Sequence, residues 1–253
     1  MFEFITPELL ALVGIGFAAQ LIDGALGMAF GVVSMSAMLM LGMPPAQASA
    51  VVHTAEIFTT GASAASHIYH RNVDWRLVTR LGIAGVAGAV LGAWIVSNLD
   101  GGAVRPFVSL YLCAIGVFIL FKAMRNPPLR DAPAPWVAPV GFVAGFLDAS
   151  GGGGWGPVAT SALVGSGHAP RTAVGSVNTT EFFVTSAAAT TFFVELGASP
   201  LPSVAALVAG GVIAAPFGGW LVKHISPRAL MIMIGALILA LAAWQLARSF
   251  KLL

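Results

Sequence analysis

Four carboxylic acids lie in otherwise apolar stretches of the chain, at Asp23, Glu56, Asp148 and Glu181. An ionisable side chain at the centre of a membrane costs about 2.5–3.5 kcal/mol even on the mildest scale, so such residues are functional candidates. A carboxylate there can bind a proton, accept hydrogen bonds or hold a cation.

The two aspartates and the two glutamates differ in their local context. Asp23 and Asp148 stand just before Gly-rich segments, where a short carboxylate can instead cap the next helix. For them, proton coupling and capping are equally open. Glu56 and Glu181 lie about ten residues inside longer apolar segments, where no helix end needs a cap. We expect all four to bind coupling protons, the glutamates being the stronger candidates because the remaining alternative for them is a buried hydrogen bond.

One turn before each glutamate, the sequence has His53 or Asn178, followed by Thr54 or Thr179. On a helix, positions 53 and 56 face the same way. An imidazole beside Glu56 would titrate near physiological pH and could carry a proton or meet an anion. A buried histidine with a purely structural hydrogen bond explains the pattern equally well.

Glycines crowd the chain directly after both aspartates. Such density opens a helix and lets the backbone approach a ligand closely. Helices beginning near Gly27 and Gly152 would point N–H groups and a positive dipole end at an anion. Alternatively, the glycines serve only close helix packing. The expected substrate-binding residues are Gly27, Gly31, His53, Thr54, Ser150, Gly151, Gly152, Gly153, Gly154, Trp155, Asn178 and Thr179. We expect Trp155, which stands opposite Phe30, to gate or line the pocket.

The acids and glycines recur at an offset of 125 residues, from Asp23 to Asp148 and from Glu56 to Glu181. Between residues 16 and 61, 17 of 46 positions match their counterpart, where composition alone would give a handful. The chain therefore consists of two copies of one unit. Repeat one covers residues 1–125, a linker covers 126–136, and repeat two covers 137–253.

Composition indicates a membrane protein, because the 253 residues include only 12 Lys and Arg and 10 Asp and Glu, and 58% are apolar. Crossing the hydrocarbon takes about 20 apolar residues. We predict an all-α polytopic fold with six spans, at residues 46–69, 77–98, 104–124, 172–194, 201–222 and 229–247. Ahead of each set of three spans lie two shorter apolar segments. We predict that they form half-helix pairs at 8–42 (8–22 and 28–42) and 137–167 (137–147 and 155–167).

The basic residues predict the orientation. With an odd number of crossings per copy, nine Lys and Arg fall on one side and Arg105, Arg248 and Lys251 on the other, which matches the positive-inside rule. Both termini are then non-cytoplasmic and the copies have opposite orientations. Inverted repeats with short, Gly-interrupted segments are typical of secondary transporters. The net charge of +2, without a basic face, gives no sign of a nucleic-acid partner.

An enzyme is the less favoured interpretation. Ser150 and His168 loosely resemble an intramembrane serine protease. Their counterparts in repeat one are Ala25 and Met43, and His168 would lie about 20 Å away at helical rise. We expect no catalysis, no cofactor and no metal site.

Two copies of a Gly-rich, acid-bearing break, each followed by a Pro-led segment with Thr-x-Glu, resemble the sulfite exporter TauE/SafE family. The most specific parts are 24–31 with 45–56, and 151–157 with 170–181. The resemblance implies a bacterial inner-membrane permease that exports sulfite or a related small sulfur anion, such as an organosulfonate. Repeat one departs from the glycine pattern at Leu26, Met28 and Ala29, which changes that half of the pocket.

An anion would meet acids at the breaks, whereas the Lys and Arg of the predicted spans, Arg80, Arg105 and Lys122, stand near the span ends. We therefore expect helix dipoles and Thr, Ser and Asn groups to hold the anion while the acids bind protons, in proton-linked transport by alternating access. The alternative is a cation or metal-ion permease in which the acids are the ligands. A membrane scaffold would have no polar cavity between the breaks. The expected partners are a small anion, protons and the lipid bilayer.

Overall fold

The computed structural model describes residues 6–26, 28–124, 136–166, 168–224 and 227–250. Over these ranges the regular structure is all helical, as predicted, and it contains no strand. The elements are α1 (Pro7–Leu26), α2 (Phe30–Met40), α3 (Pro45–Tyr69), α4 (Trp75–Ser97), α5 (Gly101–Ala123), α6 (Val137–Gly151), the π-helical turn η1 (Gly156–Thr160), α7 (Ser161–Gly165), α8 (Pro170–Leu196), α9 (Leu201–His224) and α10 (Pro227–Ser249). The predicted linker lies almost entirely outside the described residues.

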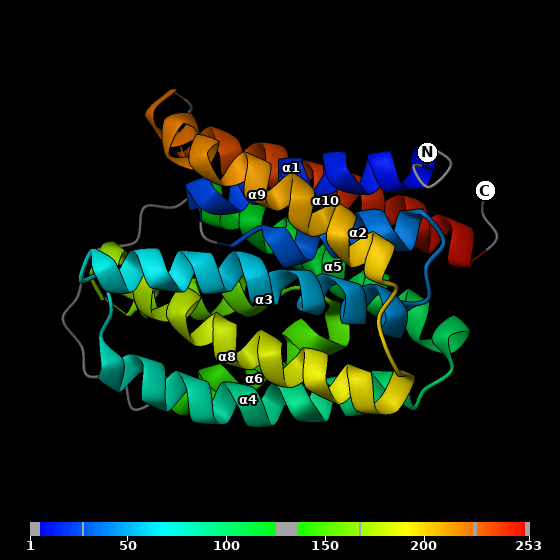
Figure 1. Ribbon diagram of the computed structural model, residues 1–253, viewed down its shortest axis with the longest axis horizontal. Helices are drawn as coiled ribbons and strands as arrows, with labels where there is room; N and C mark the ends of the chain where they lie inside the picture. Colours follow the sequence, from blue (N-terminus) through cyan, green and yellow to red (C-terminus); the bar gives the residue numbers. More distant parts are fainter. Residues whose placement is uncertain (1–5, 27, 125–135, 167, 225–226, 251–253) are drawn as a thin grey trace.

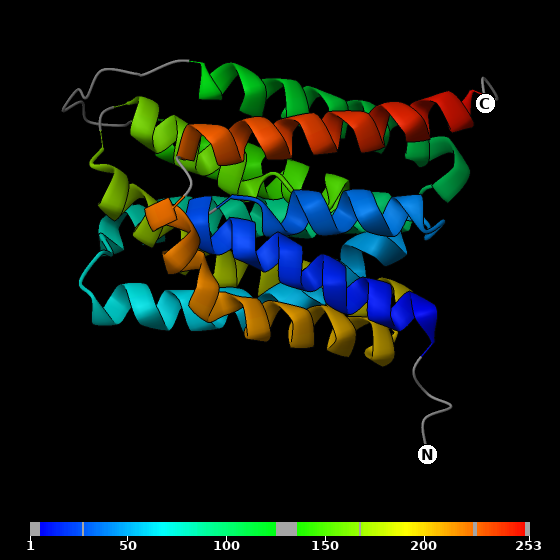
Figure 2. The same ribbon diagram turned by 90° about the horizontal axis from the view of Figure 1, so that it is seen from above.

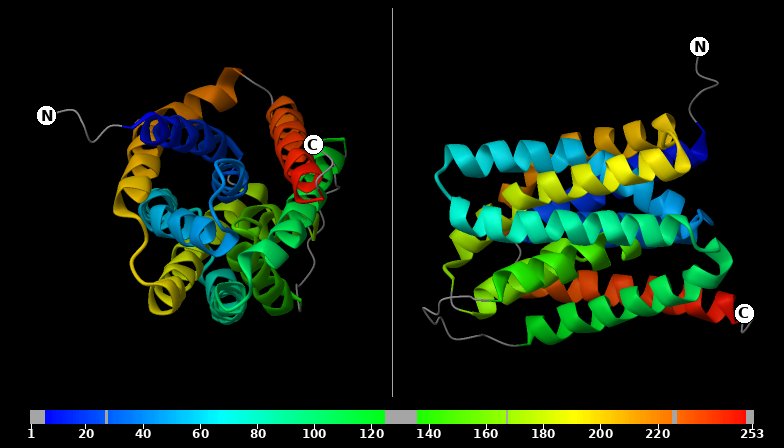
Figure 3. Two further views of the ribbon diagram at one scale, coloured as in Figure 1. Left: turned by 90° about the vertical axis from the view of Figure 1, so that its right-hand side faces the viewer. Right: turned by 90° about the horizontal axis from the view of Figure 1, so that it is seen from below.

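The helices lie side by side in one bundle, and α1 begins at the end of the bundle where α10 ends (Figure 1). Helix α2 turns back from the middle of the bundle, so α1 and α2 form a hairpin that opens at that end (Figure 2). Helix α6, η1 and α7 form a second hairpin, which opens at the opposite end (Figure 3). The two hairpin tips therefore meet near the centre of the bundle.

Local chemistry fixes several helix starts. Pro45 and Pro170 occupy the first positions of α3 and α8, where proline has the right φ and its missing N–H is not needed. The Asp74 carboxylate accepts the N–H of Arg76 at the start of α4. Asp100 likewise accepts the N–H of Ala103 at the start of α5. Such caps satisfy N–H groups that have no partner within the helix.

Both first half-helices are longer than predicted. Helix α1 runs through Asp23 to Leu26, and α6 runs through Asp148 to Gly151, whereas the sequence predicted ends at 22 and 147. A glycine inside a helix costs only about 1 kcal/mol, which is too little to end one against tertiary packing. Helix α6 ends where the chain turns left-handed at Gly152, with φ of 71°.

The two sequence repeats are interleaved in space. Helix α1 packs on α9, α3 on α8, α4 on α6 and α5 on α10. Each of these four pairs joins one helix from each repeat. Glycines form the α4–α6 seam. A Cβ atom on Gly145 would lie 2.9 Å from the carbonyl carbon of Gly85, and one on Gly88 would lie 2.9 Å from that of Phe142. Small residues thus allow the backbones to touch, as is common between membrane helices.

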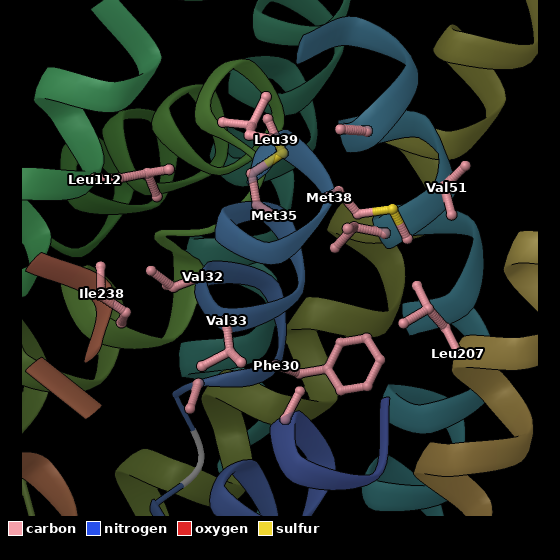
Figure 4. Packing of buried hydrophobic residues seen from close by; sticks show 14 of the residues in the cluster. Phe30, Val32, Val33, Met35, Met38, Leu39, Val51, Leu112, Leu207 and Ile238 are labelled. Atoms are coloured by element: carbon pink, nitrogen blue, oxygen red, sulfur yellow. The ribbon is translucent and has the colours of Figure 1, made fainter. Parts of the chain in front are cut away.

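Two hydrophobic clusters result. The first surrounds α2, where Phe30, Met35 and Leu39 pack among side chains from α3, α5, α9 and α10 (Figure 4). The second joins α4, α6 and α8 around the fully buried Trp155 and Phe192. Among the described helices, α4 and α5 are long and apolar enough to cross a membrane by length and composition alone, and the number of six spans stays a prediction.

Candidate functional site

Asp23 caps the second helix of its own hairpin. Its Oδ1 atom accepts the N–H of Ala29 at 2.8 Å and that of Phe30 at 3.3 Å. These N–H groups belong to the start of α2, where the first turn has no intrahelical acceptors. The N–H groups of Gly31 and Val32 follow in the same turn.

Asp148 has the same relation to the second break and a further partner. Its Oδ1 accepts the N–H of Trp155 at 2.9 Å, just before η1 begins. Its Oδ2 lies 3.2 Å from Nε2 of His53, which belongs to α3 of the other repeat. Both side chains are buried, His53 completely. The capping interpretation therefore holds for both aspartates in this conformation, and one of them also joins the two repeats.

The surroundings of His53 place one proton on the His53–Asp148 pair. Its Nδ1 lies 2.8 Å from the carbonyl oxygen of Ser49, which can only accept, so Nδ1 carries a hydrogen. The contact between Nε2 and the Asp148 carboxylate then needs a proton on one side or the other. The Ser49 hydroxyl donates to the carbonyl of Ala149 and so holds α3 against α6. This arrangement can store and release a proton between the repeats.

Glu56 faces the junction of the two breaks. Its Oε2 accepts a hydrogen bond from Thr185 Oγ1 at 3.2 Å, and Thr185 also lies 3.1 Å from the carbonyl oxygen of His53. A Cβ atom on Gly31 would lie 2.9 Å from Oε1 of Glu56 and 3.1 Å from the Cα of Gly153. Only a glycine at position 31 lets the two hairpin tips and this glutamate meet so closely.

A small cavity lies between the hairpin tips. All four predicted acids line it, together with backbone of both breaks: Asp23, Met28, Ala29, Phe30, Gly31, Val32, Glu56, Asp148, Gly153, Gly154, Gly156, Pro157 and Glu181. No Lys, Arg or His is among these described residues. About 10 Å³ is open to the centre of a water molecule, room for about one water and too little for an oxyanion. This conformation is closed around its polar centre.

Some predicted binding residues lie elsewhere. Thr54 donates to the carbonyl of Ala50, Thr179 to that of Gly175, and Ser150 to that of Phe146. Within a helix, Ser and Thr often make such bonds to the carbonyl four residues before. Of the predicted glycines, Gly31, Gly153 and Gly154 line the cavity, Gly151 and Gly152 do not, and Gly27 lies outside the described residues.

Asn178 and Trp155 also point away from the centre. The Asn178 amide donates toward Ser63 at 3.2 Å and toward His67 at 3.4 Å. Trp155 lies in the second hydrophobic cluster and donates its indole N–H to the carbonyl of Val177 at 3.1 Å. It fits there because Gly85 leaves room: a Cβ atom on Gly85 would lie 2.7 Å from the indole ring.

Two residues at the breaks escaped the sequence analysis, both from α5. Tyr111 donates its hydroxyl to the carbonyl of Gly153 at 2.7 Å. Lys122 donates to Ser161 Oγ at 3.0 Å and lies 3.9 Å from the sulfur of Met28, so its ammonium group bridges the two hairpins. Neither has a counterpart 125 residues later, where Ala236 replaces the tyrosine and Ala247 replaces the lysine. The repeat therefore gave no signal for them.

The buried polar groups also include a possible cation site. One ligand atom each from His53, Glu56 and Asp148 lies within 4.8 Å of the others. The bond from His53 Nδ1 to a backbone carbonyl is the kind that orients a metal-binding imidazole.

Comparison with known proteins identifies the family. The family model described as sulfite exporter TauE/SafE matches residues 12–244, nearly the whole chain. The chain belongs to the sulfite exporter TauE/SafE family. The resemblance found in the breaks and the Thr-x-Glu segments is thus confirmed.

Relatives of this TauE/SafE chain are described as transporters. A probable membrane transporter protein, YtnM, from Bacillus subtilis (strain 168) is 42% identical over 245 residues, covering 93% of this chain and 82% of the relative. A probable membrane transporter protein from Haemophilus influenzae is 29% identical over 120 residues, 46% of this chain and 44% of the relative. No solved structure matches. The chain is a membrane transporter by family.

Proposed function

We propose that this TauE/SafE chain is a secondary transporter that exports sulfite or a related small sulfur-containing anion, such as an organosulfonate, linked to protons, by alternating access. The family description supports the substrate class. The position of Asp23 and Asp148 on the N-termini of the second half-helices supports the chemistry most directly. Anionic oxygens already occupy both places where a substrate anion would bind.

This relation supplies a coupling mechanism. An ionised aspartate holds the N–H groups at the start of α2 or η1 and thereby excludes a second anion. When the aspartate binds a proton, it loses its charge and its advantage at the helix dipole, so the same N–H groups become available to the substrate. Anion binding and proton binding then occur together.

The glutamates would carry protons across the closed centre. Four carboxylates facing one cavity repel one another when ionised, and bound protons relieve that repulsion. Glu56 can take a proton from the His53–Asp148 pair, since all three groups lie within 4.8 Å. Glu181 has no hydrogen-bond partner within the described residues and lines the same cavity, which suits a group that exchanges protons.

The architecture that supports this mechanism is an inverted repeat. The two hairpins opening at opposite ends are consistent with the opposite orientations that the basic residues predict, and with both termini on the non-cytoplasmic side of a bacterial inner membrane. In alternating access, the cavity between the hairpin tips would open to one side of the membrane and then to the other. The two hydrophobic clusters would move relative to each other as it does so.

Transport assays test the proposal. Purified protein in liposomes should carry sulfite at a rate that depends on an imposed proton gradient. Replacing Glu56 and Glu181 together by Gln should remove that dependence while the fold is kept. The matched control is Glu195→Gln, because Glu195 lies exposed at the end of α8. Unchanged pH dependence in the double variant would contradict proton carriage by these residues.

The His53, Glu56 and Asp148 cluster favours a second candidate, a cation or metal-ion permease. In that case Mn²⁺ or Zn²⁺ would raise the melting temperature of the wild type and not that of Glu56→Gln. Sulfite flux would then be absent from liposomes that still carry the cation. Sulfite flux without metal-dependent stabilisation would reject this candidate.

A further inference from the structure

A second pocket lies at the end of the bundle where α1 begins, away from the central cavity. It is formed by the end of α2, the first turns of α5 and the last turns of α10, and its volume is about 290 Å³. That is the low end of the range for small-molecule sites. Its lining residues are Leu39, Met40, Gly42, Gly102, Arg105, Pro106, Trp244 and Gln245.

Arg105 is the charged residue of this lining, and no acid joins it there. One of its terminal N–H groups donates to the carbonyl of Leu39 at the end of α2. A guanidinium group has five N–H donors, so most of its donors are not used within the described chain. Arg105 also has no ion pair within the described residues, where the ion pair present joins His53 to Asp148 in the central site.

The other walls suit a small anion. Trp244 is about half exposed and has an indole N–H that can only donate. Gln245 is held in place, because its amide donates to the carbonyl of Ser36 at 3.0 Å and its oxygen accepts from Ser109 at 3.3 Å. Met40 and Pro106 provide apolar surface. The pocket thus combines a positive fork, a further donor and apolar walls.

We infer that this pocket binds a small oxyanion through Arg105 and serves as an anion site separate from the acid-lined centre. The planar guanidinium fork can hold two oxygens of such an anion at once. That the natural ligand is a sulfur oxyanion rests on the proposed function, whereas oxyanion binding itself rests on Arg105. In the predicted orientation the pocket faces the non-cytoplasmic side, where an exported anion leaves.

The charge contrast gives the pocket its role. The central cavity is lined by four acids and the Arg105 pocket by one base. An anion released from the centre gains a favourable partner at Arg105, so the pocket would draw it away from the acids. The first turns of α5 would therefore form part of the path that the anion follows.

Trp244 makes the inference directly testable by fluorescence. Sodium sulfate, sodium sulfite and sodium methanesulfonate are titrated into purified protein in detergent, against sodium chloride at equal ionic strength. We expect a saturable change in the wild type and its loss in Trp244→Phe. Arg105→Gln should weaken the affinity about tenfold or more, because it removes the charge and the fork. Arg105→Lys keeps the charge and should weaken it less.

The control is Arg76→Gln, which should leave binding unchanged because Arg76 is exposed at the start of α4. Equal affinity in Arg105→Gln and the wild type would overturn the inference. So would a response to phosphatidylglycerol alone, which would make the pocket a lipid headgroup site. Anion binding that persists in the Glu56 and Glu181 double variant, when its proton-linked flux is lost, would separate this site from the proposed mechanism.

Discussion

The imidazole of His53 in α3 lies 3.2 Å from the carboxylate of Asp148 in α6, so a basic group of one repeat holds the break acid of the other. Their counterparts in the other repeat, Asn178 and Asp23, do not contact each other in this way. Asn178, which corresponds to His53, donates toward Ser63 and His67 instead. One proton-binding pair thus lies on one side of a centre that is otherwise built from two similar halves.

Replacing His53 by Asn should destabilise the protein, because Asp148 then loses its buried partner. Breaking a buried pair from one side costs about 3–5 kcal/mol. Thermal unfolding in detergent would measure it, with His168→Asn as the control, since His168 lies in the loop before α8 and outside the central site.

The double variant with Asp148→Asn tests whether the two residues act as a pair. Its cost should be clearly less than the sum of the two single costs. Additive costs would contradict a direct interaction between His53 and Asp148.

Gly31→Ala should abolish transport while the bundle still folds. The new methyl group would lie 2.9 Å from Glu56 Oε1 and 3.1 Å from the Cα of Gly153, so the hairpin tips would have to part. Sulfite flux in liposomes is the measurement. Gly14→Ala is a matched control in α1, where the added Cβ atom meets nothing within 4 Å. Flux in Gly31→Ala equal to that of this control would show that the close approach is not needed.

Tyr111→Phe should cost about 0.5–1.5 kcal/mol of stability, because it removes one buried hydrogen bond and keeps the ring. The carbonyl of Gly153 would be left without that donor. Tyr69→Phe is the control, since Tyr69 is 83% exposed. Melting curves of the two variants that coincide would argue against a role for Tyr111 in holding the second break.

Lys122→Met should lower anion transport more than it lowers stability. The ammonium group lies between Ser161 and Met28, and Met28 lines the central cavity. Its loss removes a positive charge beside that lining, and with it an attraction for an approaching anion. Flux measured at low and high salt checks this, since the difference between Lys122→Met and wild type should shrink as salt screens the charge. A difference independent of salt would indicate a structural role.

The sequence predicted the parts of this architecture that depend on local pattern. Helical class, two Gly-rich breaks and the four acids near them follow from composition and the repeat, and all four acids do line one cavity. The partner of His53 did not follow, because spacing along one helix suggested Glu56 and the hydrogen bond goes to Asp148, 95 residues away. Contacts between interleaved repeats leave no trace in local spacing.

Trp155 shows the same limit in another way. An aromatic residue inside a Gly-rich break suggested a gate, yet its ring fills a space made by a missing side chain at Gly85 in α4. That vacancy lies on a distant helix, and a single sequence does not reveal which side chain will fill it. The aspartates posed a different problem. The same carboxylate can cap a helix in one conformation of the protein and bind a proton in another, and the sequence does not distinguish the two.

The separation of the two hydrophobic clusters has an energetic consequence. The first cluster is built around α2 and the second around Trp155. The cavity where the hairpin tips meet is lined by four acids and glycine backbone, together with apolar side chains such as Phe30 and Val32. Parting the tips would therefore wet polar and apolar surface together. Exposure of apolar surface raises the heat capacity and exposure of polar surface lowers it. The change between closed and open forms should therefore have a small heat-capacity signature, so its enthalpy should vary little with temperature.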